Sequence, residues 1–184
     1  MNAKFSIETL AKQGTVSRSM AESVATHIRD LRKKVIQESF QDFRQVDHRL
    51  EFVAKVRGVE YIDDAKASNV NSTWFALENM TRSVVWIAGG KTDDIDFSSM
   101  RNLVGKKVKH IVCLGKDNSA ITEAFGDVVS NIIQTDTMPH AVQAAYLLAE
   151  EGDVVLLSPA CPSFDLFESY QDKGMQFKRA VCEL

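Results

Sequence analysis

The stretch "VEYIDDAKASNVNSTWFALENM", from Val59 to Met80, decides the fold class of this chain. It opens with the apolar run "VEYID", passes through a polar loop, and continues into the longer segment "NVNSTWFALENM". A short run rich in β-branched and aromatic residues indicates a strand, whereas apolar residues three and four positions apart indicate a helix. We therefore predict a strand, a loop and a helix in succession.

The same alternation continues to the end of the chain. Further strand-like runs are "SVVWIAGG", "HIVCLG", "NIIQT" and "DVVLLSP", and the helix-like segments between them are "FSSMRNLVGKK", "NSAITEAF" and "MPHAVQAAYLLAEE". A last helical stretch, 164–184, is expected to break near Gly174. Apolar strands that alternate with helices predict a doubly wound α/β domain, with a mainly parallel sheet covered by helices on both faces.

Two features precede this alternation. The run "HRLEFVAKVRGVEYID" predicts a β-hairpin that turns at Arg57 and Gly58. Nearer the N-terminus, apolar residues recur at steps of three and four and predict an amphipathic helix, whose apolar positions are Met20, Val24, Ile28, Leu31 and Val35. We place a boundary between a helical segment, 1–46, and the α/β domain, 47–184.

The composition excludes several classes of protein. The formal net charge of −3 gives no general attraction for nucleic acid, and no apolar run approaches the roughly 20 residues that span a membrane. Three cysteines without a CxxC pair are typical of a reduced, cytoplasmic protein without a structural zinc site. A single soluble domain with an appendage is the expected organisation.

The loops after the predicted strands hold the candidate site residues, because open α/β sheets bind ligands at the carboxyl ends of their strands. In the first loop, Lys66 follows the acid pair Asp63–Asp64, and Ser68 is either a helix N-cap or a hydroxyl donor to a bound anion. In "SPACPSFD", two prolines frame Cys161. A cysteine nucleophile is not expected, since the strand-end loops show no histidine motif to activate it.

Common nucleotide-binding motifs are missing from the sequence. It contains neither GxGxxG nor GxxxxGK[ST], the two glycine-rich loops that cradle phosphates. If the chain handles a nucleotide, another domain must hold most of it.

Four stretches taken together, "HRLEFV", "YIDDAKASNVNST", "IAGG" and "VVLLSPACPSFDLFESYQDKGMQF", resemble the C-terminal domain of the Mur ligases, and most nearly the D-glutamate-adding branch. The resemblance runs from about Phe5 to the end and is strongest from His48 onward. It implies a Rossmann-like domain that brings the incoming amino acid to a three-domain enzyme, with 1–46 being the end of the central ATPase domain.

The resemblance implies an ATP-dependent reaction of peptidoglycan synthesis in the cytoplasm. ATP, assisted by Mg²⁺, phosphorylates the carboxylate of UDP-N-acetylmuramoyl-L-alanine, and the amine of D-glutamate then forms an amide. The UDP-binding domain and the P-loop domain, which also holds the Mg²⁺, would be separate from this chain, which would be inactive alone.

The resemblance also implies a role for each matching residue. Arg49 would reach the ATP phosphates, and Asp64 would contact the nucleotide ribose. D-glutamate would be bound by Lys66, Ser68, Ser163, Phe164 and Tyr170, with the last three around its side-chain carboxylate. No residue of this chain is expected to be a catalytic group or a metal ligand.

Two other interpretations stay open. In "GGKTDDID", Asp93 stands where relatives often carry a lysine, although Lys91 precedes it, and this favours a non-catalytic binding module of the same fold. The pair Asp63–Asp64 also resembles the acid pair of phosphoacceptor signalling domains. Such domains need an aspartate and a lysine at two later strand ends, where this chain has "LGKDN" and "LLSPAC".

Overall fold

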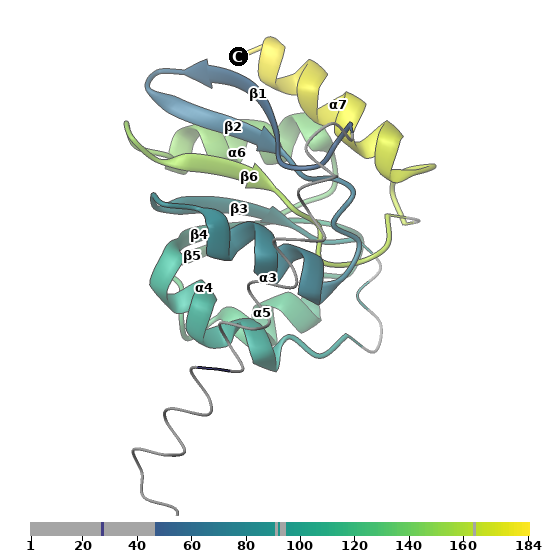
Figure 1. Ribbon diagram of the computed structural model, residues 1–184. Coiled ribbons are helices and arrows are strands. Elements are labelled where there is room, and N and C mark those ends of the chain that lie inside the picture. The colour runs from purple at the N-terminus through teal and green to yellow at the C-terminus, as the bar shows by residue number, and fades with distance from the viewer. Residues whose placement is uncertain (1–26, 28–46, 91, 93–94, 164) are drawn as a thin grey trace, which may run out of the picture. The chain divides into compact units, whose positions relative to one another are not determined.

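The computed structural model describes residue 27 and residues 47–90, 92, 95–163 and 165–184. In this part of the chain, six strands form one sheet in the order β1-β2-β6-β3-β4-β5 (Figure 1). Strand β1 runs antiparallel to β2, and the other four neighbouring pairs are parallel. The prediction of a mainly parallel α/β sheet is therefore confirmed.

The predicted hairpin consists of β1 (Glu51–Val56) and β2 (Val59–Asp63). Arg57 and Gly58 connect the two strands with φ angles of 51° and 80°. A two-residue turn with positive φ at both positions matches the right-handed twist of the flanking strands. Glycine adopts positive φ freely, whereas arginine does so at a cost. The guanidinium of Arg57 lies 5.0 Å from the ring centroid of Tyr146, and this cation–π contact helps to stabilise the turn.

Helices and strands alternate after the hairpin, as the sequence predicts. Each helix except the last connects one strand to the start of the next strand in the chain, and because these strands are parallel this is the geometry of a βαβ unit. The elements are α3 (Val70–Asn79), β3 (Val84–Ala88), the 3₁₀ turn η1 (Ser98–Met100), α4 (Arg101–Lys107), β4 (Val108–Leu114), α5 (Ser119–Phe125), β5 (Asn131–Thr135), α6 (Met138–Leu148), β6 (Val154–Leu157) and α7 (Tyr170–Cys182).

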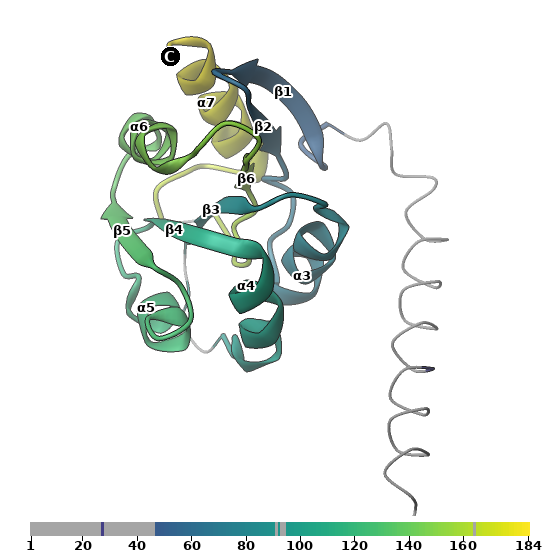
Figure 2. The ribbon, with the colours of Figure 1, turned by 90° about the vertical axis from the view of Figure 1, so that its left-hand side faces the viewer.

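Helices cover both faces of the sheet. Figure 2 shows α3, α4 and α5 on one side and α6 and α7 on the other. The first layer encloses Trp86 and Phe125, whose rings meet edge to face at 5.6 Å, and the second encloses Tyr61 and Phe177. Because both faces are covered, every residue of β3 is buried, as expected for a central parallel strand.

The position of β6 determines which loops are neighbours. Although β6 is the last strand in the chain, it lies between β2 and β3. Leu157 of β6 pairs with Asp63 of β2 on one side and with Ile87 of β3 on the other. The carboxyl ends of the three strands are therefore aligned, and the loops that follow them meet at one edge of the sheet.

The last helix differs from its prediction. We expected a helical stretch over 164–184 with a break near Gly174, but α7 begins at Tyr170, after the N-cap Ser169, and continues unbroken to Cys182. Gly174 serves close packing instead, since a Cβ atom there would lie 2.1 Å from Nδ1 of His48. Helical glycine costs roughly 0.5–1 kcal/mol relative to alanine, a cost that this contact explains.

The amphipathic helix predicted between residues 20 and 35, and the segment 1–46 as a whole, lie outside the described residues apart from His27. Among the described residues, no helix has both the length and the apolar character needed to cross a membrane.

Candidate functional site

The candidate site lies at the carboxyl ends of β2, β6 and β3. The loop after β2 leads to α3 on one face of the sheet, whereas the loop after β6 leads to α7 on the other. Adjacent strands whose connections leave in opposite directions open a crevice between their loops, and ligands of α/β proteins bind in such crevices. The loop of Lys66 after β2 and the loop "SPACPSFD" after β6, both singled out in the sequence, meet here beside the end of β3.

Asp64 and Arg49, the two predicted nucleotide-binding residues, lie together in this crevice. Nη1 of Arg49 is 3.5 Å from Oδ1 of Asp64, and the carboxylate is fully buried. Its Oδ2 accepts a hydrogen bond of 2.9 Å from Oγ of Ser158, and its Oδ1 accepts one of 3.3 Å from the backbone N–H of Leu50. Burial raises the pKa of Asp64 to about 7, although Arg49 and Ser158 act in the opposite direction.

A chain of buried hydroxyl groups holds Asp64 from the side of α3. Oγ of Ser158, directly after β6, lies 2.8 Å from Oγ1 of Thr73 in α3. The carbonyl of Ser158 also accepts a hydrogen bond of 2.7 Å from Nε1 of Trp86. The sequence interpretation did not identify Ser158 or Thr73, because neither stands in a recognisable motif and they are 85 residues apart.

Asp63, the other half of the acid pair, has a separate set of partners. Its Oδ2 lies 2.6 Å from Nδ1 of His48, and its Oδ1 accepts a hydrogen bond of 2.9 Å from the backbone N–H of Ala65. The sequence interpretation found no histidine in the strand-end loops. His48, which precedes β1 in the sequence, lies beside the carboxyl end of β2 in the fold. There it contacts Asp63 rather than Cys161.

His48, Glu51 and Asp63 form a group of possible metal ligands, with one atom of each within 4.8 Å of the others. Their contacts are those of a hydrogen-bonded network. Both carboxylate oxygens of Glu51 lie 2.7 Å from Nζ of Lys178, and the 2.6 Å contact between His48 and Asp63 is a hydrogen bond. These hydrogen bonds account for the close grouping of the three side chains without a metal ion.

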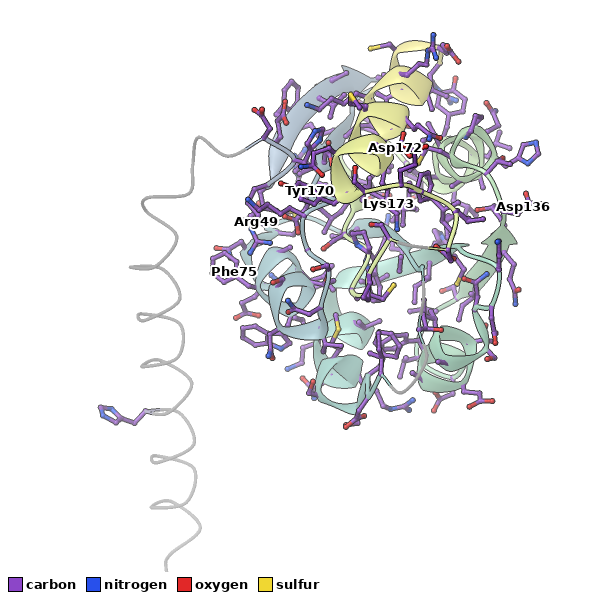
Figure 3. The ribbon with its side chains drawn as sticks, turned by 90° about the vertical axis from the view of Figure 1, so that its right-hand side faces the viewer. Arg49, Phe75, Asp136, Tyr170, Asp172 and Lys173 are labelled. Carbon is purple, nitrogen blue, oxygen red and sulfur yellow. The ribbon has the colours of Figure 1, made fainter. Side chains whose placement is uncertain are left out.

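The structure places Lys66 beside Tyr170, two of the residues predicted to bind D-glutamate. Nζ of Lys66 lies 5.6 Å from the ring centroid of Tyr170, and that ring meets the ring of His48 edge-on at 6.3 Å. The backbone N–H of Lys66 donates to the carbonyl of His48 over 3.1 Å. Tyr170 is the first residue of α7 (Figure 3), so this contact joins the loop after β2 to the last helix.

Ser68 is exposed and does not cap α3, so that part of its predicted role is wrong. The N-cap is Asn69, whose side chain accepts a hydrogen bond of 2.9 Å from the backbone N–H of Ser72. Asparagine and serine are nearly equal as N-caps, and the helix begins one residue later than the sequence indicated. The hydroxyl of Ser68 remains accessible to a ligand.

Ser163 is buried in the loop after β6, and its Oγ has no hydrogen-bond partner in the described part of the chain. Its carbonyl accepts hydrogen bonds from the backbone N–H groups of Asp165 and Phe167. The expectation that a helix N-terminus directly follows Ser163 is wrong, because α7 starts at Tyr170. Phe164, another of the five residues predicted to bind D-glutamate, lies outside the described residues, as do Lys91 and Asp93.

Lys173, which the sequence interpretation missed, is the other notable group in this crevice. It is fully buried in α7, and its Nζ donates to the carbonyl of Gly89 over 2.9 Å. Burial lowers the pKa of this lysine. Little in the sequence indicates this burial, since a lysine in "SYQDKGMQF" is typical of a solvated helix face.

These features define an α/β domain with a buried acid–guanidinium pair and a lysine–tyrosine contact at the carboxyl ends of its central strands. The chain belongs to the family described as "Mur ligase, glutamate ligase domain". The family model matches residues 48–161. The chain is 49% identical over 187 aligned residues to the UDP-N-acetylmuramoylalanine–D-glutamate ligase of Christiangramia forsetii, covering all of this chain and 42% of that protein. It is 46% identical to the ligase of the same name from Porphyromonas gingivalis, covering 96% of this chain and 40% of that one.

Solved structures show the same fold at low sequence identity. The bifunctional folylpolyglutamate synthase/dihydrofolate synthase of Yersinia pestis, complexed with AMPPNP and a manganese ion, gives a TM-score of 0.53 at 15% identity, covering 76% of this chain and 32% of that one. The UDP-N-acetylmuramate–alanine ligase of Thermotoga maritima gives 0.51 at 14% identity, covering 79% and 32%. This chain spans about two fifths of the length of the curated relatives reported above.

Proposed function

We propose that this chain is the amino-acid-binding part of an ATP-dependent ligase that joins D-glutamate to UDP-N-acetylmuramoyl-L-alanine through an amide bond. The observation that carries the proposal is the convergence of Lys66, Tyr170 and the Arg49–Asp64 pair at one end of the sheet. It occurs in a chain that is 49% identical along its whole length to a ligase of that name.

The buried Arg49–Asp64 pair can bind the ribose and phosphate groups of a nucleotide. Asp64 can accept hydrogen bonds from the hydroxyl groups of a ribose, and the guanidinium of Arg49 beside it can bind phosphate oxygens. When bound, ATP supplies the phosphoryl group that activates the acceptor carboxylate. The role of Ser158 and Thr73 is to fix the Asp64 carboxylate, so that its orientation does not have to be established on binding.

The residues around Lys66 and Ser163 can bind the carboxylates of an acidic amino acid. Lys66 and the exposed hydroxyl of Ser68 are donors for a carboxylate, and the buried hydroxyl of Ser163 is a donor without a protein partner among the described residues. Tyr170 contributes an aromatic wall beside Lys66. In this proposal Phe164, which follows Ser163 in the sequence, also binds D-glutamate.

We assign no Mg²⁺ ligand to the described residues. Mg²⁺ prefers oxygen ligands in octahedral geometry, whereas the group of His48, Glu51 and Asp63 contains a histidine and is held by internal hydrogen bonds. In this proposal the ion is held by the part of the ligase that lies outside this chain.

A chimera tests the proposal. This chain replaces the aligned segment of the Christiangramia forsetii ligase, and release of phosphate from ATP is measured with UDP-N-acetylmuramoyl-L-alanine, with and without D-glutamate. We expect phosphate release that depends on D-glutamate, and a loss of at least about 100-fold for Lys66→Ala, because truncating one partner of a desolvated charge pair costs about 3 kcal/mol or more. Lys106→Ala, in an exposed residue of α4, is the matched control and should retain activity.

Two results would contradict this assignment. Turnover by Lys66→Ala equal to that of the unmodified chimera would remove Lys66 from the site. A correctly folded chimera that binds D-glutamate but releases no phosphate would favour the alternative of a non-catalytic binding module.

A further inference from the structure

Lys173 is a buried lysine beside the Gly89–Gly90 corner after β3, and it has no ion-pair partner among the described residues. The ammonium of Lys173 is fully buried, donates to the carbonyl of Gly89 over 2.9 Å, and lies 4.9 Å from the ring centroid of Phe167. In the described part of the chain, no carboxylate forms a salt bridge with it. The titratable groups that act on it are Cys161 and Asp165, both in the loop after β6.

Burying the ammonium of Lys173 costs free energy unless a negative charge lies close to it. Moving an ammonium ion out of water costs several kcal/mol, and a single hydrogen bond to a carbonyl, a π-face and a nearby carboxylate offset it only in part. Lys173 lies next to an apolar cluster that includes Phe167 and Phe177, where a methionine or leucine would pack without this cost. A residue that violates the local pattern in this way marks a functional position.

The surroundings of Lys173 contain a second incomplete group. Oγ of Ser163 is buried and lacks a hydrogen-bond partner among the described residues. A Cβ atom on Gly90 would lie 2.4 Å from the carbonyl oxygen of Pro162 and 3.4 Å from Nζ of Lys173. The Gly89–Gly90 corner, directly after β3, therefore lies close to the loop carrying Ser163, beside the ammonium of Lys173. An ammonium has three N–H donors, of which Gly89 uses one.

We propose that Lys173 is a specificity-determining residue, the fixed counter-charge beneath the subsite that takes the side-chain carboxylate of the incoming amino acid. It acts through its electrostatic field, which the surrounding protein screens far less than water would. The inference rests on the function proposed above and adds the origin of its selectivity for an acidic side chain.

The expected effect is large, because water does not screen this charge. Two unit charges roughly 6–7 Å apart, at an effective dielectric constant of about 20, interact strongly enough to change binding roughly 50-fold. A neutral amide in the same subsite gains almost none of this. Lys173 should therefore favour D-glutamate over D-glutamine.

The experiment measures kcat/KM of the chimera for D-glutamate and for D-glutamine, which has nearly the same shape without the charge. Lys173→Met should reduce the value for D-glutamate by roughly 50-fold and leave the value for D-glutamine within about threefold, so that the preference collapses. Lys173→Arg, which keeps the charge, should keep the preference. Arg179→Met, in an exposed residue of the same helix, is the matched control and should also keep it.

The same measurement distinguishes the two proposals. If the unmodified chimera ligates neither amino acid, the proposed function fails and this inference fails with it. If the unmodified chimera prefers D-glutamate and Lys173→Met retains that preference, only the inference is overturned. An equal loss on both substrates would show a structural role and would also overturn it.

A pH profile provides a test that needs no apolar variant. As Lys173 loses its proton at alkaline pH, KM for D-glutamate should rise while KM for D-glutamine stays constant, and this rise should begin below the ordinary lysine pKa of 10.5. Cys161 and Asp165 both favour the charged form of Lys173, and burial opposes it. In Lys173→Arg the rise should disappear, because arginine does not titrate in this range. A rise of equal size in both proteins would overturn the inference.

Discussion

Replacing Asp64 with asparagine should make the domain more stable at neutral and alkaline pH while weakening its nucleotide site. The carboxyl is fully buried, and burial raises its pKa from the ordinary value of 3.8 to about 7. A carboxyl whose pKa is higher in the folded than in the unfolded state binds its proton more tightly when folded. Its contribution therefore favours folding at low pH, and this advantage is lost as the pH rises from about 4 to about 7.

The magnitude follows from the same two pKa values. Since each pKa unit corresponds to about 1.4 kcal/mol, the free energy of unfolding should fall by about 4 kcal/mol across this range because of Asp64 alone. Asparagine resembles the neutral acid in shape and can still accept the hydrogen bond from Ser158. Asp64→Asn should thus lack this fall, and at pH 8 it should be more stable than the wild type by as much as about 4 kcal/mol.

Urea denaturation at pH 5, 6, 7 and 8, followed by the fluorescence of Trp74 and Trp86, measures this difference. The stability gap between Asp64→Asn and the wild type should be roughly 1.5–2 kcal/mol at pH 5, widen up to pH 7 and level off between pH 7 and pH 8. Asp127→Asn is the control, because Asp127 is exposed and its pKa is lowered by Arg101, so it is ionised at all four pH values. Parallel pH profiles for Asp64→Asn and the wild type would refute the argument.

Gly174→Ala should lower the free energy of unfolding by about 2–4 kcal/mol, because its Cβ would lie 2.1 Å from Nδ1 of His48. The control is Gly105→Ala, whose Cβ would have its nearest contact at 3.9 Å and which should raise the free energy of unfolding by about 0.5–1 kcal/mol. Thermal melts of both variants test this pair, and destabilisation of equal size in both would contradict it. Under native conditions iodoacetamide should modify the exposed Cys182 first, since burial raises the pKa of Cys161 and of the other buried thiol to about 12. Mass spectrometry over time checks the order, and early labelling of Cys161 would show that this loop opens.

The repetition of apolar runs and helical segments was enough to predict the α/β class and the hairpin. That pattern is local, since it depends on which side chains a strand or a helix buries within one element. The order of the strands is not local. The insertion of β6 between β2 and β3 aligns Asp63, Leu157 and Ile87, and no feature of any single segment indicates that arrangement.

The candidate site shows the same division between local and long-range information. The loops and the residues Lys66 and Tyr170 could be identified from composition and from resemblance. The partners of the acid pair could not, because Asp63 and Asp64 are adjacent in sequence but face opposite sides of the sheet. Asp63 contacts His48, close to α7, whereas Asp64 contacts Ser158, which is 94 residues away and bonded in turn to α3.

This opposite orientation has a functional consequence. The Asp64 network leads to Arg49 and the proposed nucleotide edge, whereas the Asp63 network leads through His48 to Tyr170 and the proposed amino-acid pocket. One strand end therefore supports both halves of the crevice with two consecutive residues and two separate sets of hydrogen bonds. The hydrogen bonds described above for the two sets share no side chain, so a change such as Asp64→Asn should alter nucleotide affinity more than D-glutamate affinity. Titration of the Asp64→Asn chimera with each ligand measures this separation, and an equal loss for both would mean that the backbone of β2 couples the two networks.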